Sequence, residues 1–157
     1  MEFNYETLTE LENELVYPSF SRADAMELGT ILYRESFQYG FPIAVEITIN
    51  GLVVYRCFQD GVAPQSDKWL AYKRNVVEAQ GMGSLRFGML LEKNGETPED
   101  CKMDPSTSAC GGGGMQILIQ DTGMIGSICV SGCPDHLVDQ EIITNGMRTL
   151  LLQKTGK

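Results

Sequence analysis

The pair Asn50-Gly51 is the feature that most restricts how this chain can fold. It separates two runs, 41–49 and 52–58, that are rich in β-branched and aromatic residues. The tight turn that joins two antiparallel strands needs positive φ at both central residues, and Asn and Gly adopt it at the lowest cost. The two runs are therefore predicted to form a β-hairpin.

A second hairpin is predicted nearer the C-terminus. Residues 115–120 and 124–131 have the composition of strands and flank Asp121-Thr122-Gly123. Because each pair of strands is joined by a tight turn, the predicted sheet is antiparallel, with room for a fifth strand. The free N–H and C=O groups at its edges need cover, which oligomerisation can provide.

Helical segments surround these hairpins in the order α, α, ββ, α, α, ββ, α, which predicts an α+β fold. The helices are expected over residues 5–16, 21–39, 67–80 and 84–93, and from Pro134 to about 153. Ser21 and Asp24 have the spacing of a capping box, and Asp67 is expected to cap the third helix. The predicted inward-facing residues are Met26, Leu28, Leu32, Tyr33 and Phe37 in the second helix, and Trp69, Tyr72, Val76 and Val77 in the third.

The length of 157 residues favours a single domain over 1–157, with residues 1–18 as an N-terminal helical extension. Acidic residues outnumber basic ones by 21 to 12, for a net charge of -9. Such a surface repels phosphate backbones, so nucleic-acid binding is not expected. No run of residues has the length and hydropathy of a membrane span.

The five cysteines are an odd number in a domain large enough to fold without disulfides. Residues 1–15 are acidic and lack the basic start and apolar core of a secretion signal. Reduced thiols in a cytoplasmic protein are therefore the expected state.

Four segments of the chain occur in the order and spacing of a known group. They are Ala25-Met26-Glu27-Leu28-Gly29, residues 69–77 (WLAYKRNVV), residues 112–117 (GGGMQI) and residues 125–132 (IGSICVSG). Together they resemble the HbpS/GlcG-like family, which includes the haem-binding protein HbpS and the C-terminal domain of PduO-type proteins. The similarity covers roughly residues 8–152 and is greatest to the haem-degrading-domain branch found in bacteria and fungi.

This resemblance implies a profilin-like antiparallel sheet flanked by helices, a homo-oligomer, and a haem or related tetrapyrrole ligand. The chain departs from the family pattern at 80–84, where relatives tend to read Phe-Gly-His-Ser-Ser and this chain reads Gln-Gly-Met-Gly-Ser. An Asp-His pair of the relatives maps either onto Asp135-His136 or onto Asp139-Gln140.

Candidate ligand-binding residues cluster on the third predicted helix. Trp69 and Lys73 are four residues apart and share one helical face. Lys73 and Arg74 beside Trp69 could attract carboxylates of a ligand, and Ser84 could donate a hydrogen bond or cap the next helix. The alternative is that Trp69 belongs to the core while the two cations pair with surface acids.

The glycines Gly112, Gly113 and Gly114 precede a strand and have two interpretations. Their backbone could approach a ligand or hold an anion with its N–H groups, or it could cross a neighbouring segment tightly. His136, the only histidine, is expected in the first turn of the last helix, where the dipole favours the neutral ring. Cys129, Cys133 and His136 have spacing reminiscent of metal ligands, but a strand and a turn do not form a zinc knuckle, so no metal is expected.

Three functions follow from these observations. The first is a homo-oligomeric binding protein whose pocket, near Trp69, Lys73, Ser84 and the glycine loop, takes a small anionic and partly apolar ligand, with haem as the first candidate cofactor. The second is an oligomeric scaffold or interaction protein without a ligand. The third is an enzyme that modifies haem or a cofactor, although the residues form no recognisable catalytic constellation.

Overall fold

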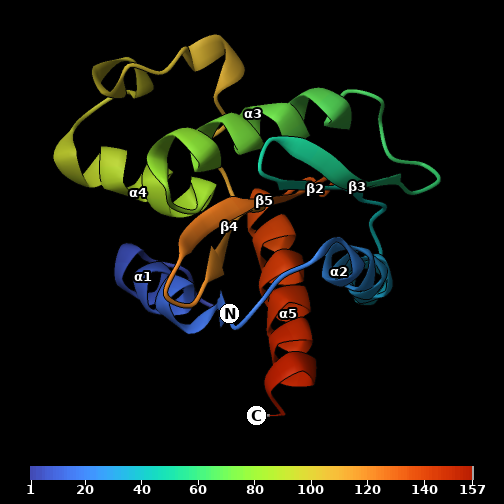
Figure 1. Ribbon diagram of the computed structural model, residues 1–157. Helices are drawn as coiled ribbons and strands as arrows, with labels where there is room; N and C mark the ends of the chain where they lie inside the picture. The colour runs from blue at the N-terminus through green and yellow to red at the C-terminus, as the bar shows by residue number, and fades with distance from the viewer. Residues whose placement is uncertain (157) are drawn as a thin grey trace.

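A five-stranded sheet forms the centre of the protein in the computed structural model, which describes residues 1–156 (Figure 1). Its strands are β1 (Val16–Tyr17), β2 (Ala44–Ile49), β3 (Leu52–Phe58), β4 (Gly114–Ile119) and β5 (Gly123–Ser131), in the spatial order β1-β4-β5-β2-β3. Both predicted hairpins are confirmed, β2–β3 and β4–β5. Asn50 and Gly51 adopt the positive φ values of 50° and 80° that the first turn requires.

The two hairpins join through β2 and β5, which pair antiparallel. The fifth strand is β1, and it runs parallel to β4. No hairpin turn connects β1 to its neighbour, so nothing in the local chain imposes the antiparallel direction that the other strands share. The α+β fold is thus as predicted, with one parallel pair at the edge of an otherwise antiparallel sheet.

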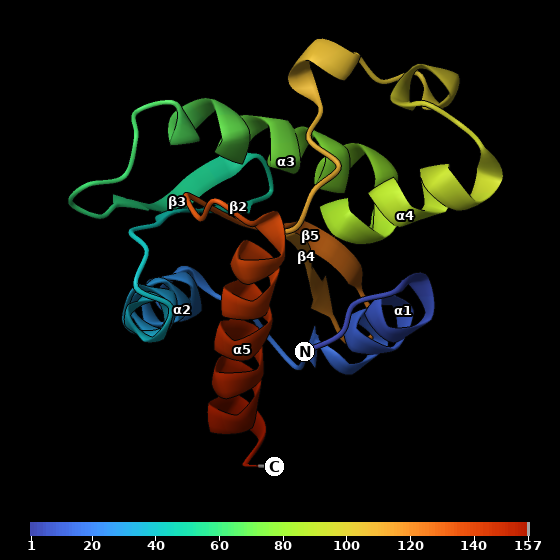
Figure 2. The same cartoon turned by 180° about the vertical axis from the view of Figure 1, so that it is seen from behind.

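Helices cover both faces of the sheet (Figures 1 and 2). On one face lie α3 (Ser66–Gln80) and α4 (Ser84–Asn94), and on the other lie α1 (Tyr5–Glu14), α2 (Arg22–Glu35) and α5 (His136–Thr155). Short 3-10 turns occupy Ser36–Gln38, Pro98–Cys101 and Pro105–Thr107. Alternation along β5 sends Ile128 and Val130 into the main core and Cys129 toward Leu70 of α3.

The N-terminal helix is joined to this body by a buried carboxylate. Glu12 is 3% exposed and accepts hydrogen bonds from the Gly83 N–H at 3.1 Å, Gln116 Nε2 at 2.9 Å and Arg86 at 3.3 Å. Burial raises the pKa of Glu12, while Arg86 acts to lower it. Leu8, Leu11 and Leu15, which helical spacing places on one face of α1 and the residue after it, are buried in the same core as the sheet.

Several predicted inward positions are wrong. The capping box of α2 is present, and Leu28 and Leu32 are buried, but Met26, Tyr33 and Phe37 are 62%, 42% and 66% exposed. The buried stripe of α2 runs through Ala25, Leu28, Gly29 and Leu32, and this spacing turns the larger residues outward.

The start and the inner face of α3 also differ from expectation. Asp67 does not cap this helix; it lies in the first turn, after the N-cap Gln65. Trp69 is 44% exposed, because Leu70, Lys73, Val76 and Val77 form the face that packs on the sheet.

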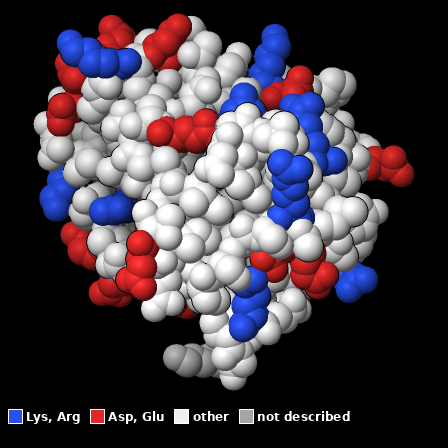
Figure 3. Space-filling view, in the orientation of Figure 1, with Lys and Arg blue, Asp and Glu red and all other residues white. Residues whose placement is uncertain are grey.

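Charged side chains of both signs are interspersed around the face drawn in Figure 3, with a wide uncharged area between them. Within residues 1–156, no helix has the length and hydropathy to cross a membrane.

Candidate functional site

A cavity of about 620 Å³ opens where the starts of α3 and α5 approach the segment that precedes β4. The C-terminal end of β5 and the turn that follows it complete the wall. The lining includes Trp69 and Lys73 of α3, Gly111, Cys133, and His136 and Asp139 of α5. Helix α3 and the glycine segment, which are distant in the sequence, therefore share one hollow.

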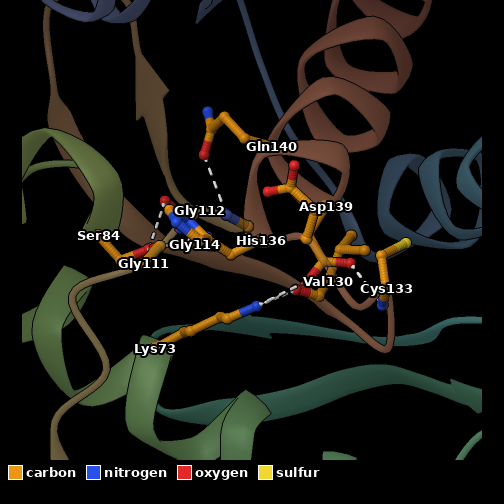
Figure 4. A network of polar contacts seen from close by, with 12 residues as sticks. Lys73, Ser84, Gly111, Gly112, Gly114, Val130, Cys133, His136, Asp139 and Gln140 are labelled. Carbon is orange, nitrogen blue, oxygen red and sulfur yellow. Dashed lines mark hydrogen bonds and ion pairs between the residues drawn. The ribbon is translucent and has the colours of Figure 1, made fainter. Parts of the chain in front are cut away.

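The inner wall of the cavity is a buried ion pair. The side chains of Lys73 and Asp139 are 5% and 3% exposed, and the Lys73 Nζ lies 3.3 Å from Asp139 Oδ2. The same ammonium donates a hydrogen bond to the Val130 carbonyl at 2.7 Å, and the Cys133 N–H donates to Asp139 Oδ1 at 3.2 Å (Figure 4). Burial raises the pKa of Asp139, with Lys73 opposing that rise. Lys73 is thus a buried cation with a buried counter-ion.

The glycine run beside the cavity is held by hydrogen bonds within the protein. The N–H groups of Gly112, Gly113 and Gly114 donate to His136 Nδ1 at 2.9 Å, Gln140 Oε1 at 3.0 Å and Ser84 Oγ at 3.0 Å (Figure 4). These amides have no free N–H with which to form an anion nest. The arrangement corresponds to the tight crossing that was one of the two interpretations of this segment.

His136 lies at the first position of α5 and is exposed to the cavity. Its Nδ1 accepts the Gly112 N–H, so Nδ1 carries no proton. With Nδ1 acting as an acceptor, the ring proton lies on Nε2. A nitrogen that binds iron must present a lone pair, so this arrangement does not fit His136 as an axial ligand of haem.

The remaining candidates of the sequence lie outside the cavity lining. Arg74, next to Lys73 in the chain, points to the other side and pairs with Glu46, which is 3% exposed and also binds Arg56. Ser84 is fully buried and donates to the Gly111 carbonyl at 2.6 Å. Gly112, Gly113 and Gly114 are buried as well. The cavity therefore brings together Trp69, Lys73 and His136 from the predicted set.

The polar side chains of the cavity that were absent from that set include Ser66, Ser131, Cys133 and Asp139. Asp139 follows His136 by three residues, the spacing of one helical face, and this is the signal that could have indicated it. Burial, followed by the nearby Asp139 charge, raises the pKa of the Cys133 thiol to about 12. Such a thiol is a poor nucleophile at neutral pH.

No group of three or more His, Cys, Asp or Glu side chains in the described part of the chain is arranged to hold a metal ion. A second hollow of about 560 Å³ adjoins the cavity and shares Cys110, Gly111 and His136 with it. Its other walls include the apolar side chains of Leu85, Met89 and Leu137. The cavity and this more apolar hollow thus meet at His136.

Comparison with known proteins gives a consistent result. A family model described as "Haem degrading protein HbpS-like" matches residues 20–148, which leaves α1 outside the matched region. A UPF0303 protein of Streptomyces coelicolor is 30% identical over 145 residues, covering 92% of this chain and 91% of that protein. A UPF0303 protein of Rhizobium etli is 31% identical over 92% of this chain and 87% of its own length.

Solved structures share the fold at low sequence identity. The crystal structure of the Ybr137w protein superposes with a TM-score of 0.86 at 22% identity and covers 98% of this chain and 90% of that one. The crystal structure of HbpS gives a TM-score of 0.70 at 17% identity over 83% of this chain and 89% of that one. The crystal structure of a PduOC:Heme complex gives a TM-score of 0.70 at 16% identity and covers 83% of this chain and 94% of that one.

Proposed function

Because the chain belongs to the HbpS-like family, we propose that it binds a small molecule, haem or a related tetrapyrrole, in the cavity between α3 and α5. The observation that carries this proposal is the convergence of Trp69, Lys73 and His136 on one cavity of about 620 Å³. Trp69 offers a flat aromatic surface to a planar ring. Lys73 and the Nε2–H of His136 offer hydrogen-bond donors to polar substituents.

The size and polarity of the site support a ligand of this class. Drug-sized and cofactor-sized ligands occupy hollows of about 300–1,000 Å³, and the cavity, which has both polar and apolar walls, adjoins at His136 the more apolar hollow beside α4. A tetrapyrrole has both an apolar macrocycle and acidic substituents. One of the neighbours by fold is a haem complex, which is a property of that protein and supports the choice of first ligand to test.

Titration with hemin tests this function. Trp69 is the only tryptophan of the chain, so its fluorescence reports on the cavity alone. We expect saturable quenching and a shift of the Soret band at micromolar hemin. Trp69→Leu should weaken the hemin affinity, measured from the Soret band, about tenfold through the loss of aromatic contact.

Phe37→Leu is the matched control, because Phe37 is an exposed aromatic residue of α2 outside the cavity lining. It should leave the affinity unchanged. Failure of wild-type protein to give a saturable signal would remove the tetrapyrrole proposal. His136→Ala should keep most of the affinity, since the ring is bonded to Gly112 through Nδ1.

A second function, self-association as an interaction protein, has its own support. Exposed apolar side chains gather on α2 and on the segment after it, Met26, Tyr33, Phe37 and Phe41, and a hollow of about 370 Å³ lies among the last three. Strand β3 is the outer strand of the sheet on that side and exposes Leu52, Val53 and Phe58. Such surfaces commonly form protein–protein contacts.

A further inference from the structure

Two buried serine residues of the cavity wall, Ser66 and Ser131, make no side-chain hydrogen bond within residues 1–156. Ser66 and Ser131 are 5% and 4% exposed and both line the cavity. Within residues 1–156, the sealed side-chain atoms without a hydrogen-bond partner belong to Glu12, Thr48, Arg86 and Gln116, so the hydroxyls of Ser66 and Ser131 remain accessible from the cavity. Their unused bonding capacity faces the space that a ligand would fill.

Lys73 adds a third unused group to the same wall. An ammonium has three N–H donors, and here two of them are directed at the Val130 carbonyl and Asp139 Oδ2. Helix α3 places Lys73 two turns after Ser66, and both residues line the cavity. One charged donor therefore remains for a ligand atom.

The start of α3 contributes positive potential to the cavity. Helix α3 begins at Ser66 and helix α5 begins at His136, so two helix N-termini converge on the cavity. Each contributes the equivalent of about half a positive charge. The charge of Lys73 is balanced by Asp139, and the Asp135 carboxylate caps α5 through the Leu137 N–H at 2.9 Å. At the start of α3, Asp67 is paired with Arg56, so the amides of this helix start supply the positive potential that remains.

We propose that Ser66, Ser131 and Lys73 form a carboxylate-binding site and hold an acidic substituent of the ligand by hydrogen bonds. The inference rests on the proposed function for the identity of the ligand, and it makes recognition independent of iron. The partners are positioned by the fold before binding, because two of them are on α3 and the third ends β5.

Two probe pairs test the carboxylate requirement through the fluorescence of Trp69. Protoporphyrin IX is compared with its dimethyl ester and with hemin in one low-detergent buffer, and 2-naphthoate is compared with 2-naphthamide. We expect protoporphyrin IX to bind within a few-fold of hemin, and each acid to bind about tenfold more tightly than its uncharged counterpart.

The double variant Ser66→Ala/Ser131→Ala tests the assigned residues. It should weaken binding of the acids about tenfold and bring them to the level of the neutral probes, with an unchanged or higher midpoint of thermal unfolding. The midpoint should not fall, because neither hydroxyl bonds to another group of residues 1–156 that the substitution would leave unpaired. Ser19→Ala, at an exposed site outside the cavity lining, is the control and should bind as wild type does.

The outcomes separate the two proposals. Equal affinity for acids and their neutral counterparts, or full affinity in the double serine variant, overturns the carboxylate site even if hemin binds. Binding of hemin without binding of protoporphyrin IX overturns it also, since iron would then supply the affinity. Selective binding of naphthoate with no binding of any tetrapyrrole supports the carboxylate site and removes haem as the ligand.

Discussion

Lys73 illustrates how one residue can serve both the fold and the site. Its ammonium is enclosed with the Asp139 carboxylate against β5, and the pair joins α3 to α5 across the end of the sheet. Removing one member of a buried ion pair leaves the other charge buried without a counter-ion, which lowers the free energy of unfolding strongly. Replacing both members with apolar residues lowers it much less. The same two side chains form the inner wall of the cavity.

We predict that Asp139→Asn lowers the free energy of unfolding by about 3 kcal/mol, because it leaves the buried Lys73 cation without its counter-ion. The double variant Lys73→Met/Asp139→Leu should regain most of that loss. Chemical denaturation monitored by far-UV circular dichroism measures both effects.

The exposed pair Arg148–Glu14 provides the comparison, since its atoms are 3.0 Å apart and its side chains are 40% and 49% exposed. Arg148→Ala should cost less than about 1 kcal/mol. If both substitutions lowered the free energy of unfolding by the same amount, burial of the Lys73–Asp139 pair would not be the cause of the predicted effect.

At the scale of elements, the glycine run before β4 determines how closely the layers approach. Gly113 has φ +109°, and a Cβ on it would lie 2.3 Å from the Val130 carbonyl oxygen and 2.9 Å from Lys73 Nζ. A Cβ on Gly112 would lie 2.3 Å from the His136 carbonyl oxygen. The absence of side chains lets the segment pass between α5 and β5. Its amides donate hydrogen bonds to side chains of α5 and to Ser84 of α4.

Gly113→Ala should therefore lower the free energy of unfolding by about 2 kcal/mol or more, from the strained φ and the clash with backbone. Gly111→Ala is the matched control, because Gly111 has no positive φ and the atoms nearest to a Cβ there belong to the His136 side chain, at 3.3 Å or more, rather than to backbone. Thermal unfolding of both variants measures the difference. A Gly113→Ala variant as stable as wild type would contradict the crossing as a constraint on the fold.

At the scale of the whole molecule, the exposed apolar residues of α2 and the open edge at β3 predict an assembly of identical chains. Light scattering should give a mass that is a multiple of the 17.3 kDa chain. Met26→Lys combined with Phe37→Glu should reduce the mass toward one chain, because charge at the centre of an apolar contact is costly.

Leu152→Glu is the control. Leu152 is an apolar residue of α5 that is 54% exposed, and it does not line the hollow formed by Tyr33, Phe37 and Phe41. This variant should retain the assembly. A wild-type mass equal to one chain would contradict self-association and leave the ligand-binding proposal as the only function of the two still supported.

Those features of the molecule that depend on local chemistry were predictable from the sequence. Asn50-Gly51 needs only its own φ preferences to turn the chain, and Leu8, Leu11 and Leu15 need only helical spacing to share a face. The outward direction of Tyr33 and Phe37 was not predictable, because hydrophobic character favours burial without deciding which of two faces meets the sheet.

The sequence by itself determined the two hairpins and most of the helices, because turn residues and periodicity act over a few positions. The resemblance to the family came separately, from four matching segments of the chain. Only the tertiary structure decided that Lys73 would be buried with Asp139, that Arg74 beside it would turn to Glu46, and that Ser66 and Ser131 would face one cavity. Neighbours on a helix point in different directions, and the partner of each comes from a distant segment that packing alone brings into contact.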